Sequence, residues 1–303
     1  MIPEARASSV TFRPWEPSFY EKAARYLRAD TVEFSDLTPG YYGSVFAVSD
    51  SDKENVTVAE ICGCAVYHGR HDGAFAFSFP FGGGDKAAAL RMIADHCREF
   101  SLPLRFYPVG EAELAVLREV LAGEWKVTER PETADYVYLA EQLAAPENIR
   151  VVKRALRKFE ALGPWAARDA VPEDIPAMLE VLERWTSERG GADDADHDGC
   201  RDAVVNLGRE GTLTTVVEQN GRLVSFEIGR RLNSDMLIAE FEKCVPQLPG
   251  GCQVANREFV RRWAGSSTFV NRSCDMGEPG LAKAKQMYRP CRMVRKFVAE
   301  KTM

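Results

Sequence analysis

The sequence predicts an α/β fold built from two similar units, because one order of elements occurs twice along the chain. A strand leads through a glycine-containing loop into a helix at residues 74–100 and again at 236–264. In both halves a further strand and helix follow. The length of 303 residues suits two domains of about 150 residues each, and we place them at 1–145 and 146–303. One larger mixed sheet is the alternative architecture.

The N-terminal half alternates short strands and helices. Phenylalanines at every second position over 75–81 indicate a strand with one apolar face. Gly82 to Gly84 end this strand, and Asp85 is placed to cap the next helix. The expected elements are, in order, a strand at 11–15, a helix at 17–27, strands at 56–67 and 74–81, a helix at 85–100, a strand at 104–109, a helix at 111–121, and strands at 125–129 and 135–139.

The C-terminal half repeats this order. An apolar stripe that includes Met178, Leu182 and Trp185 indicates a helix, and Asn220-Gly221 is a strong signal for a hairpin turn. The expected elements are, in order, a strand at 165–169, helices at 175–185 and 200–207, a hairpin at 212–232, a strand at 236–243, a helix at 253–263, a strand at 268–270, a helix at 280–288 and a strand at 293–298.

The charge distribution indicates a localised polyanionic partner. A net charge of −6 argues against a protein coated in nucleic acid. Residues 255–303, however, contain eleven Lys or Arg against four Asp or Glu, a local balance of +7. A second basic run contains Arg150, Lys153, Arg154, Arg157 and Lys158. The alternative for each run is a solvated helix face.

Several classes of protein have little support in the sequence. No apolar run approaches the roughly 18 residues of a membrane span, and the N-terminus has no apolar signal segment. The eight Cys and four His show no metal-binding spacing, so we expect reduced thiols, a cytoplasmic protein and no metal. Cys62 and Cys64 are expected to share one face of a strand. The acidic loop with Asp193, Asp194, Asp196 and Asp198 lacks the glycine and terminal glutamate of a calcium loop.

The candidate site follows the strand at 268–270. Polar side chains there stand between a strand and a short helix, where the carboxyl end of a strand opens into a crevice. They are Asn271, Arg272, Asp275, Lys283, Lys285, Tyr288 and Arg289.

Two glutamates lie on the preceding strand. Glu240 and Glu242 are two residues apart, so they are expected to share one face while Lys243 takes the other. A pair of carboxylates suits a general base for an attacking amine, or a clamp for an ammonium group; an edge-strand charge ladder is the alternative. This strand leads into a glycine loop at the start of a helix, an arrangement that suits a phosphate. The loop resembles the CoA pyrophosphate loop of acyl-CoA acetyltransferases (GNAT) at Gln247, Gly250 and Gly251, with Cys252 as a departure.

The chain as a whole resembles the family of the phosphatidylglycerol lysyltransferase C-terminal domain. The resemblance is carried by Asn-Arg-x-x-Asp-Met-Gly at 271–277, Gly-Leu-x-Lys-Ala-Lys at 280–285 and Tyr-x-Pro at 288–290. Upstream, Glu242, Lys243, Asn256 and the segment 135–138 also match. The resemblance implies tandem GNAT-like domains, each a mixed, mostly antiparallel sheet flanked by helices, with the active site in the C-terminal copy.

The resemblance to this family and its Fem-type relatives implies a soluble aminoacyltransferase. Its donor would be aminoacyl-tRNA and its acceptor an amine of a small molecule or peptide, with no cofactor, membrane or DNA involved. The donor ester is already activated, so the site need only position the amine and stabilise the oxyanion. The expected catalytic residues are Asn271 for the oxyanion, Asp275 or Glu242 to orient the nucleophile, and Glu240 and Tyr288 beside them.

Phosphate contacts to tRNA or CoA are expected from a larger set of residues. They are Gln247, Gly250, Gly251, Arg272, Lys283, Lys285, Arg289, Lys153, Arg154 and Arg157. Two alternatives of other classes stay open. One is an acyl-CoA-dependent N-acyltransferase that uses the glycine loop, and the other is a non-catalytic binding module.

Overall fold

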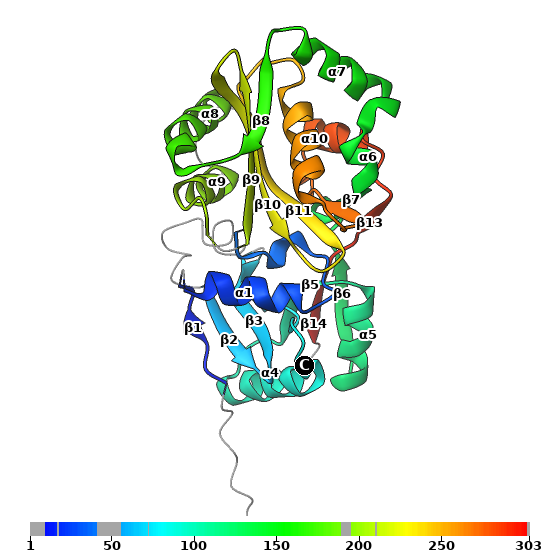
Figure 1. Ribbon diagram of the computed structural model, residues 1–303. Helices are drawn as coiled ribbons and strands as arrows, with labels where there is room; N and C mark the ends of the chain where they lie inside the picture. Colours follow the sequence, from blue (N-terminus) through cyan, green and yellow to red (C-terminus); the bar gives the residue numbers. More distant parts are fainter. Residues whose placement is uncertain are drawn as a thin grey trace, which may run out of the picture.

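The computed structural model describes residues 10–16, 18–40, 56–71, 73–188, 195–209 and 211–301. They form two seven-stranded sheets that lie one beyond the other along the molecule, with helices against their faces (Figure 1). This arrangement confirms the α/β fold of two units, each a mostly antiparallel sheet flanked by helices. The alternative of one larger sheet is wrong.

Both sheets are antiparallel except at one pair of strands each, β4 with β5 and β11 with β12. The first sheet contains, in spatial order, β1 (Arg13–Pro14), β2 (Thr57–Ile61), β3 (Cys64–His71), β4 (Ala74–Phe77), β5 (Arg105–Val109), β14 (Phe297–Lys301) and β6 (Trp125–Glu129). The second contains β13 (Arg292–Val294), β7 (Asp135–Leu139), β12 (Phe269–Asn271), β11 (Met236–Cys244), β10 (Arg222–Arg231), β9 (Thr212–Gln219) and β8 (Trp165–Asp169).

Helices cover the sheets. The first sheet carries α1 (Phe19–Arg28), α4 (Lys86–Phe100) and α5 (Glu111–Val120). One side of the second sheet carries α6 (Ala140–Ala144), α7 (Arg150–Glu160), α10 (Gly251–Trp263) and α11 (Pro279–Gln286), and the other side carries α8 (Ile175–Glu188) and α9 (Ala195–Val205). Short 3-10 turns complete the described elements: η1 (Ser35–Leu37), η2 (Pro131–Thr133), η3 (Pro146–Asn148) and η4 (Pro172–Asp174).

The two sheets exchange strands. Strand β7, which we expected to complete the N-terminal half, lies between β13 and β12 in the second sheet. The strand expected at 293–298 is two strands, because the chain leaves the second sheet after β13 and enters the first as β14, between β5 and β6. The domain division at 145/146 stays a prediction, and hydrogen-bonded strands cross it in both directions.

The predicted turn of one hairpin is confirmed, whereas a second hairpin was not predicted. Asn220 and Gly221 have the left-handed backbone that joins β9 to β10, as predicted, and Asp85 caps α4 by accepting a hydrogen bond of 2.9 Å from the Ala88 N–H. The strand expected at 56–67 is instead the hairpin β2–β3. Cys62 stands in its turn with a φ of 51° and is exposed, whereas Cys64 is buried in β3, so the two do not share a strand face.

The apolar core continues from one unit to the other. One cluster joins α1 to β3 and to residues of the second sheet, including Val137, Met236 and Ile238. Separate clusters fill the two faces of the second sheet, one under α10 and one under α8 and α9. Within the described residues, no helix has the length and apolar character to cross a membrane.

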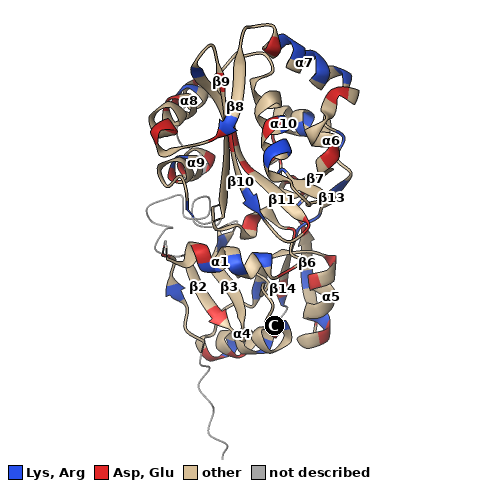
Figure 2. Ribbon diagram, viewed as in Figure 1, with Lys and Arg blue, Asp and Glu red and all other residues tan. Residues whose placement is uncertain are grey.

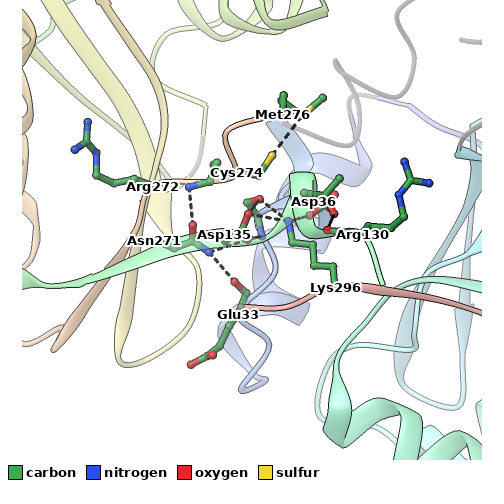
Figure 3. Close-up of polar contacts among 12 residues, drawn as sticks. Glu33, Asp36, Arg130, Asp135, Asn271, Arg272, Cys274, Met276 and Lys296 are labelled. Carbon is green, nitrogen blue, oxygen red and sulfur yellow. Dashed lines mark hydrogen bonds and ion pairs between the residues drawn. The ribbon is translucent and has the colours of Figure 1, made fainter. Parts of the chain in front are cut away.

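A buried lysine holds the crossing point between the sheets. Lys296 stands in the connection from β13 to β14 and is fully buried. Its ammonium donates to Asp135 Oδ1 at 2.7 Å and to Ser35 Oγ at 3.2 Å, and it pairs with Asp36 (Figure 3). Burial opposes the charge, but Asp135 and Asp36 outweigh it and hold the pKa of Lys296 above its usual value.

Replacing Lys296 with Met should therefore destabilise the fold strongly. The substitution leaves Asp36 and Asp135 buried without their counter-charge, which costs roughly 3–5 kcal/mol. Urea denaturation measures the change, and Lys126→Met, an exposed position on the neighbouring β6, is the matched control. Adding Asp135→Asn to Lys296→Met should recover part of the loss. A Lys296→Met protein as stable as the control would contradict this role of Lys296.

Candidate functional site at the divergence of β11 and β12

Two neighbouring strands of the second sheet, β11 and β12, pair over a short stretch and then diverge. These parallel strands pair over Met236–Ile238 and Phe269–Asn271. Beyond these pairs, β11 continues beside β10, and the chain after β12 turns toward α11. The carboxyl ends of diverging parallel strands are where α/β proteins bind ligands. The side chains that reach into this divergence are therefore the candidates for function.

An ion pair bridges the divergence. Arg272 Nη2 donates to Glu242 Oε2 at 2.7 Å. The guanidinium lies over the ring of Tyr288, 4.8 Å from its centroid, and 5.8 Å from the ring centroid of Tyr138. Burial works against the charge of Arg272, but Glu242 and the two tyrosines keep its pKa above the usual value. Arg272 is thus a fixed positive charge at this point.

A second glutamate, Glu227, stands directly across from Glu242. The two are Cα partners on β10 and β11, and Glu227 is fully buried. Asn256 of α10 donates to Glu227 Oε1 at 3.0 Å. Burial, reinforced by the charge of Glu242, raises the pKa of Glu227 well above its usual value, against the opposing effect of Arg272. The Glu227 carboxyl therefore keeps a proton at pH values where an exposed glutamate has lost it.

Three buried polar atoms around this pair have no hydrogen-bond partner among the described residues. They are Glu227 Oε2, Asn256 Oδ1 and Arg272 Nη1. Buried polar groups without partners are rare in proteins, so a group of three indicates space for a polar ligand or water. We call the surrounding residues the divergence cluster: Glu227, Glu242, Cys252, Asn256, Arg272 and Tyr288.

The thiol and the phenol of the divergence cluster are neutral. The neighbouring Cys244 thiol, burial and the charge of Glu242 together raise the pKa of Cys252. Burial raises the pKa of Tyr288 as well, although Arg272 opposes it. Glu227, whose pKa is raised, is thus the member of the cluster that exchanges a proton at a pH above the usual glutamate range.

Glu240 and Glu242 do not share a face, contrary to our expectation. The register between β10 and β11 shifts so that Ile228 pairs with Phe241 and Gly229 with Ala239, which leaves Glu240 as the extra residue of a β-bulge. Glu240 accepts from Arg230 Nε at 2.8 Å in a fully buried ion pair.

The bulge breaks the alternation on which the prediction depended. Arg230 also donates to the Tyr20 hydroxyl of α1 at 2.7 Å, so Glu240 joins the contact with the first unit. Lys243 lies on the face opposite Glu242, as predicted. It pairs with Asp196 of α9 and lies 3.8 Å from the ring centroid of Trp185.

Asn271 and Asp275 hold the backbone in place. Asn271 is fully buried, and its Nδ2 donates to the Glu33 carbonyl at 2.7 Å and to Asp135 Oδ2 at 3.0 Å (Figure 3). Its Oδ1 accepts from the Ser273 N–H at 2.7 Å. Asp275 accepts from the Tyr136 hydroxyl at 2.6 Å and from a backbone N–H of its own turn. The contacts of Asn271 leave no donor for an oxyanion, so they do not support the catalytic role that we predicted for it.

The basic residues of the 271–290 segment divide between interior and surface. Lys285 is buried, and its ammonium donates to the backbone carbonyls of Arg272 at 2.5 Å, Ser273 at 3.1 Å and Cys274. Burial lowers the pKa of Lys285 to about 8. It fixes the loop and does not reach solvent as a phosphate contact. Lys283 and Arg289 are exposed.

The glycine loop before α10 packs against protein. A Cβ at Gly250 would overlap the Ala155 carbonyl oxygen of α7, and one at Gly251 would overlap the Cys244 sulfur. Gln247 is exposed and donates to Glu188 at 3.3 Å. These glycines therefore permit α7 and β11 to approach the loop. This role differs from the phosphate site that we expected.

The corresponding loop of the first unit is closed by a carboxylate. Asp30 accepts from the Gly82 N–H at 2.7 Å and from the Lys86 ammonium at 2.9 Å. An internal anion thus occupies the position that the N-terminal glycine loop offers to a phosphate.

The +7 balance of residues 255–303 does not form a basic surface. Acidic side chains from elsewhere in the sequence neutralise most of it, because folding brings distant charges together. The pairs include Arg257 with Glu160, Arg262 with Asp169, Arg292 with Glu33, Arg295 with Glu129, and Lys296 with Asp135.

Helix α7, by contrast, keeps a basic face (Figure 2). Arg154 and Arg157 are exposed and Lys153 is half-buried, with Arg150 and Lys158 exposed beside them. No ion pair joins these five side chains to an acid within the described ranges. The apolar side of α7, with Val152, Leu156 and Phe159, faces the core.

Sequence reasoning missed Glu227 and Cys252 as members of the site. Glu227 carried no signal of burial, because Val224, Phe226 and Ile228 alternate with Ser225, Glu227 and Gly229, the pattern of a strand whose polar face meets solvent. Asn256 entered only through the family resemblance. The contact of Cys252 with Cys244 and Glu242 depends on the packing of α10, which no local pattern reveals.

A metal site finds no support in the described residues, where no group of three or more His, Cys, Asp or Glu is suitably placed. Of the acidic loop, Asp193 and Asp194 lie outside the described residues. Asp196 pairs with Lys243, and Asp198 lies 3.2 Å from the His197 ring nitrogen.

Known structures share this fold over nearly the whole chain. A conserved protein of unknown function from Bacteroides thetaiotaomicron is 21% identical with a TM-score of 0.87, covering 97% of this chain and 100% of that one. The structure of L-PGS from Bacillus licheniformis is 11% identical with a TM-score of 0.65, covering 94% and 92%. FemX is 9% identical with a TM-score of 0.60, covering 93% and 96%. At these identities the likeness concerns the fold alone.

A comparison with curated proteins gives no match. The sequence model of the family described as "Phosphatidylglycerol lysyltransferase, C-terminal" matches residues 44–300, which is most of the chain. The protein therefore belongs to the family of phosphatidylglycerol lysyltransferase C-terminal domains.

Proposed function

We propose that this protein transfers an aminoacyl group from aminoacyl-tRNA to an amine of a small-molecule or peptide acceptor, forming an amide. The family's description names a lysyltransferase, that is, an enzyme that moves an aminoacyl group. The observation that carries the proposal is the position of α7, a helix whose basic side chains form no ion pair within the described residues and which packs against the loop that leads into the divergence cluster. Ala155 of α7 contacts Gly250, two residues before Cys252 of the cluster.

The basic face of α7 suits the acceptor stem of a tRNA. Proteins bind double-stranded RNA chiefly through its phosphates and shape, and Lys and Arg without protein partners supply that contact. A stem bound along Lys153, Arg154 and Arg157 would bring its 3′ end toward the start of α10. The aminoacyl ester would then reach the divergence cluster.

The reaction requires the protein to position the two substrates and to stabilise the charges that develop. The acceptor nitrogen attacks the ester carbonyl, a C–N bond forms, the C–O bond to the ribose breaks, and the proton of the amine passes to the released ribose oxygen. Glu242 is partly exposed and is placed to orient the amine and take its proton. The Tyr288 hydroxyl, beside the Arg272 charge, is a donor for the developing oxyanion. Asn271 and Asp275 become positioning residues in this scheme.

The CoA alternative has less support from the geometry. Gly250 and Gly251 are used for close packing, and the glycine loop of the first unit is closed by Asp30. The proposed reaction also requires no cofactor or metal. Its donor, aminoacyl-tRNA, is a cytoplasmic molecule, so the proposal places the enzyme in the cytoplasm.

The direct test supplies the purified protein with mixed aminoacyl-tRNAs and a panel of amines, and reads products by mass spectrometry. We expect an aminoacyl amide whose formation stops when RNase is added first, and no acylated product from acetyl-CoA.

Glu242→Gln should slow transfer by about 10²-fold or more, because it removes the proton acceptor. Glu180→Gln, an exposed position on α8, is the control. RNase-resistant product made from acetyl-CoA would overturn the proposal.

The role of α7 has its own test. Replacing Lys153, Arg154 and Arg157 with Gln should weaken tRNA binding and reduce the slope of log K against log salt concentration by about 2 to 3, since each phosphate contact contributes about 0.7–0.9. Filter binding over a range of salt concentrations measures both quantities. The matched control replaces Arg91, Arg118 and Lys126, three exposed basic residues of the first unit. Equal salt slopes for both triple variants would exclude α7 as the contact.

A further inference from the structure

We propose that the divergence cluster binds a primary ammonium group of a substrate between Glu227 and Glu242, and that Glu227 releases its proton when the ammonium enters. The inference rests on the proposed function, in which two primary amines take part. One belongs to the aminoacyl group of the donor and the other to the acceptor. Their shared chemistry is a positively charged nitrogen with three N–H donors.

The two carboxyl groups are arranged to enclose a cation. Directly opposed residues of antiparallel strands have Cβ atoms about 4.5–5.5 Å apart, and Glu227 and Glu242 are such a pair. Two carboxylates on such a pair repel each other, since the charge of Glu242 raises the pKa of Glu227, and a proton or a cation beside them relieves the repulsion. Arg272 neutralises Glu242 through one nitrogen and does not bond to Glu227 in the structure.

The unpartnered atoms match an ammonium that stands next to a carbonyl. Glu227 Oε2 and Asn256 Oδ1 are buried acceptors, and an ammonium donates to such atoms. Arg272 Nη1 is a buried donor, and a substrate carbonyl oxygen accepts from such an atom. An aminoacyl group carries both features on adjacent atoms, whereas a simple amine carries only the first.

Charge balance explains why a proton and an ammonium exclude each other. When Glu227 is protonated, the negative charge of Glu242 and the positive charge of Arg272 cancel. With Glu227 ionised, the cluster has one uncompensated buried negative charge, which is costly. An ammonium between the carboxylates restores neutrality.

The other titratable and charged groups that face Glu227 come from β11, α10, β7 and the segments after β12 and α11. Glu242 is ion-paired on β11 and Arg272 is charged after β12. Burial keeps Cys252 of α10, Tyr288 after α11 and Tyr138 of β7 neutral by raising the pKa of each. One proton per bound ammonium is therefore the expected exchange.

Glu242 and Arg272 form the solvent-facing side of the divergence cluster. The Glu242 side chain is 22% exposed and that of Arg272 is 11% exposed, whereas Glu227 and Asn256 lie fully buried behind them. An ammonium would pass Glu242 first and then meet Glu227.

The test is titration calorimetry at pH 7 in buffers of different ionisation enthalpy, which counts protons exchanged on binding. The probes are alaninamide (amine and carbonyl), n-butylamine (amine alone) and acetamide (carbonyl alone). We expect alaninamide to bind with release of up to one proton and at least 10-fold more tightly than acetamide. If alaninamide binds much more tightly than butylamine, the bound ammonium belongs to the aminoacyl group of the donor. If the two affinities are equal, it belongs to the acceptor amine. Acetamide binding as tightly as alaninamide, or alaninamide binding without proton release, would overturn the proposal.

Glu227→Gln is the decisive variant because it keeps the shape of the side chain and removes its proton exchange. It should bind alaninamide at least 10-fold more weakly and release no proton, whereas Glu180→Gln should behave as the original protein does. Unchanged affinity and proton release in Glu227→Gln would also overturn the proposal.

Unfolding across pH shows whether this variant is folded and whether Glu227 titrates as described. Because the folded-state pKa of Glu227 is raised, its contribution to stability is full below the unfolded pKa of about 4.3 and is lost as pH rises through the folded pKa. Glu227→Gln should remain folded and lack this decline; a decline unchanged in the variant would contradict the assignment. Amide binding needs no tRNA, so a protein that binds alaninamide as expected and transfers nothing from aminoacyl-tRNA would refute the proposed function alone.

Discussion

The ammonium group of Lys296 is the interaction on which the rest of the structure depends. It lies where the chain leaves one sheet and enters the other, and it meets carboxylates from two distant segments, Asp36 of η1 and Asp135 of β7 (Figure 3). A buried charge of this kind is stable only when its partners are held at bonding distance. The strand exchange, the entry of β14 into the first sheet and the position of β7 in the second therefore depend on one another.

The same centre orients the segment that follows β12. Asp135 also accepts from Asn271, so the end of β12 is bonded to the crossing point (Figure 3). The Arg272 side chain points away from this point and donates to Glu242. Lys285 then fixes the carbonyls after β12. Polar residues that resemble catalytic groups in the sequence thus serve as supports. In our proposal the chemistry is carried out by side chains that these residues hold in position, chiefly Glu242 and Tyr288.

The sequence predicted what depends on local pattern. The helix at 85–100 follows from a cap and its apolar stripe, and the hairpin turn at Asn220-Gly221 from backbone preference. Because residues 271–290 directly follow a strand, they were predicted as the candidate site, but this position did not predict the roles of the individual residues. Partners distant in sequence could not be foreseen. Periodicity does not reveal that β13 and β14 enter different sheets, or that a bulge moves Glu240 to the face opposite Glu242.

In our proposal the aminoacyl end of a tRNA reaches the divergence cluster from α7. The most direct measurement is a crystal structure with a short RNA stem that carries an amide-linked, non-hydrolysable alanyl group at its 3′ end. We expect the stem phosphates to lie along Lys153, Arg154 and Arg157, the alanyl nitrogen between Glu227 and Glu242, and the alanyl carbonyl oxygen at Arg272. An alanyl group bound elsewhere, for example at the Gly82–Gly84 loop of the first unit, would contradict it.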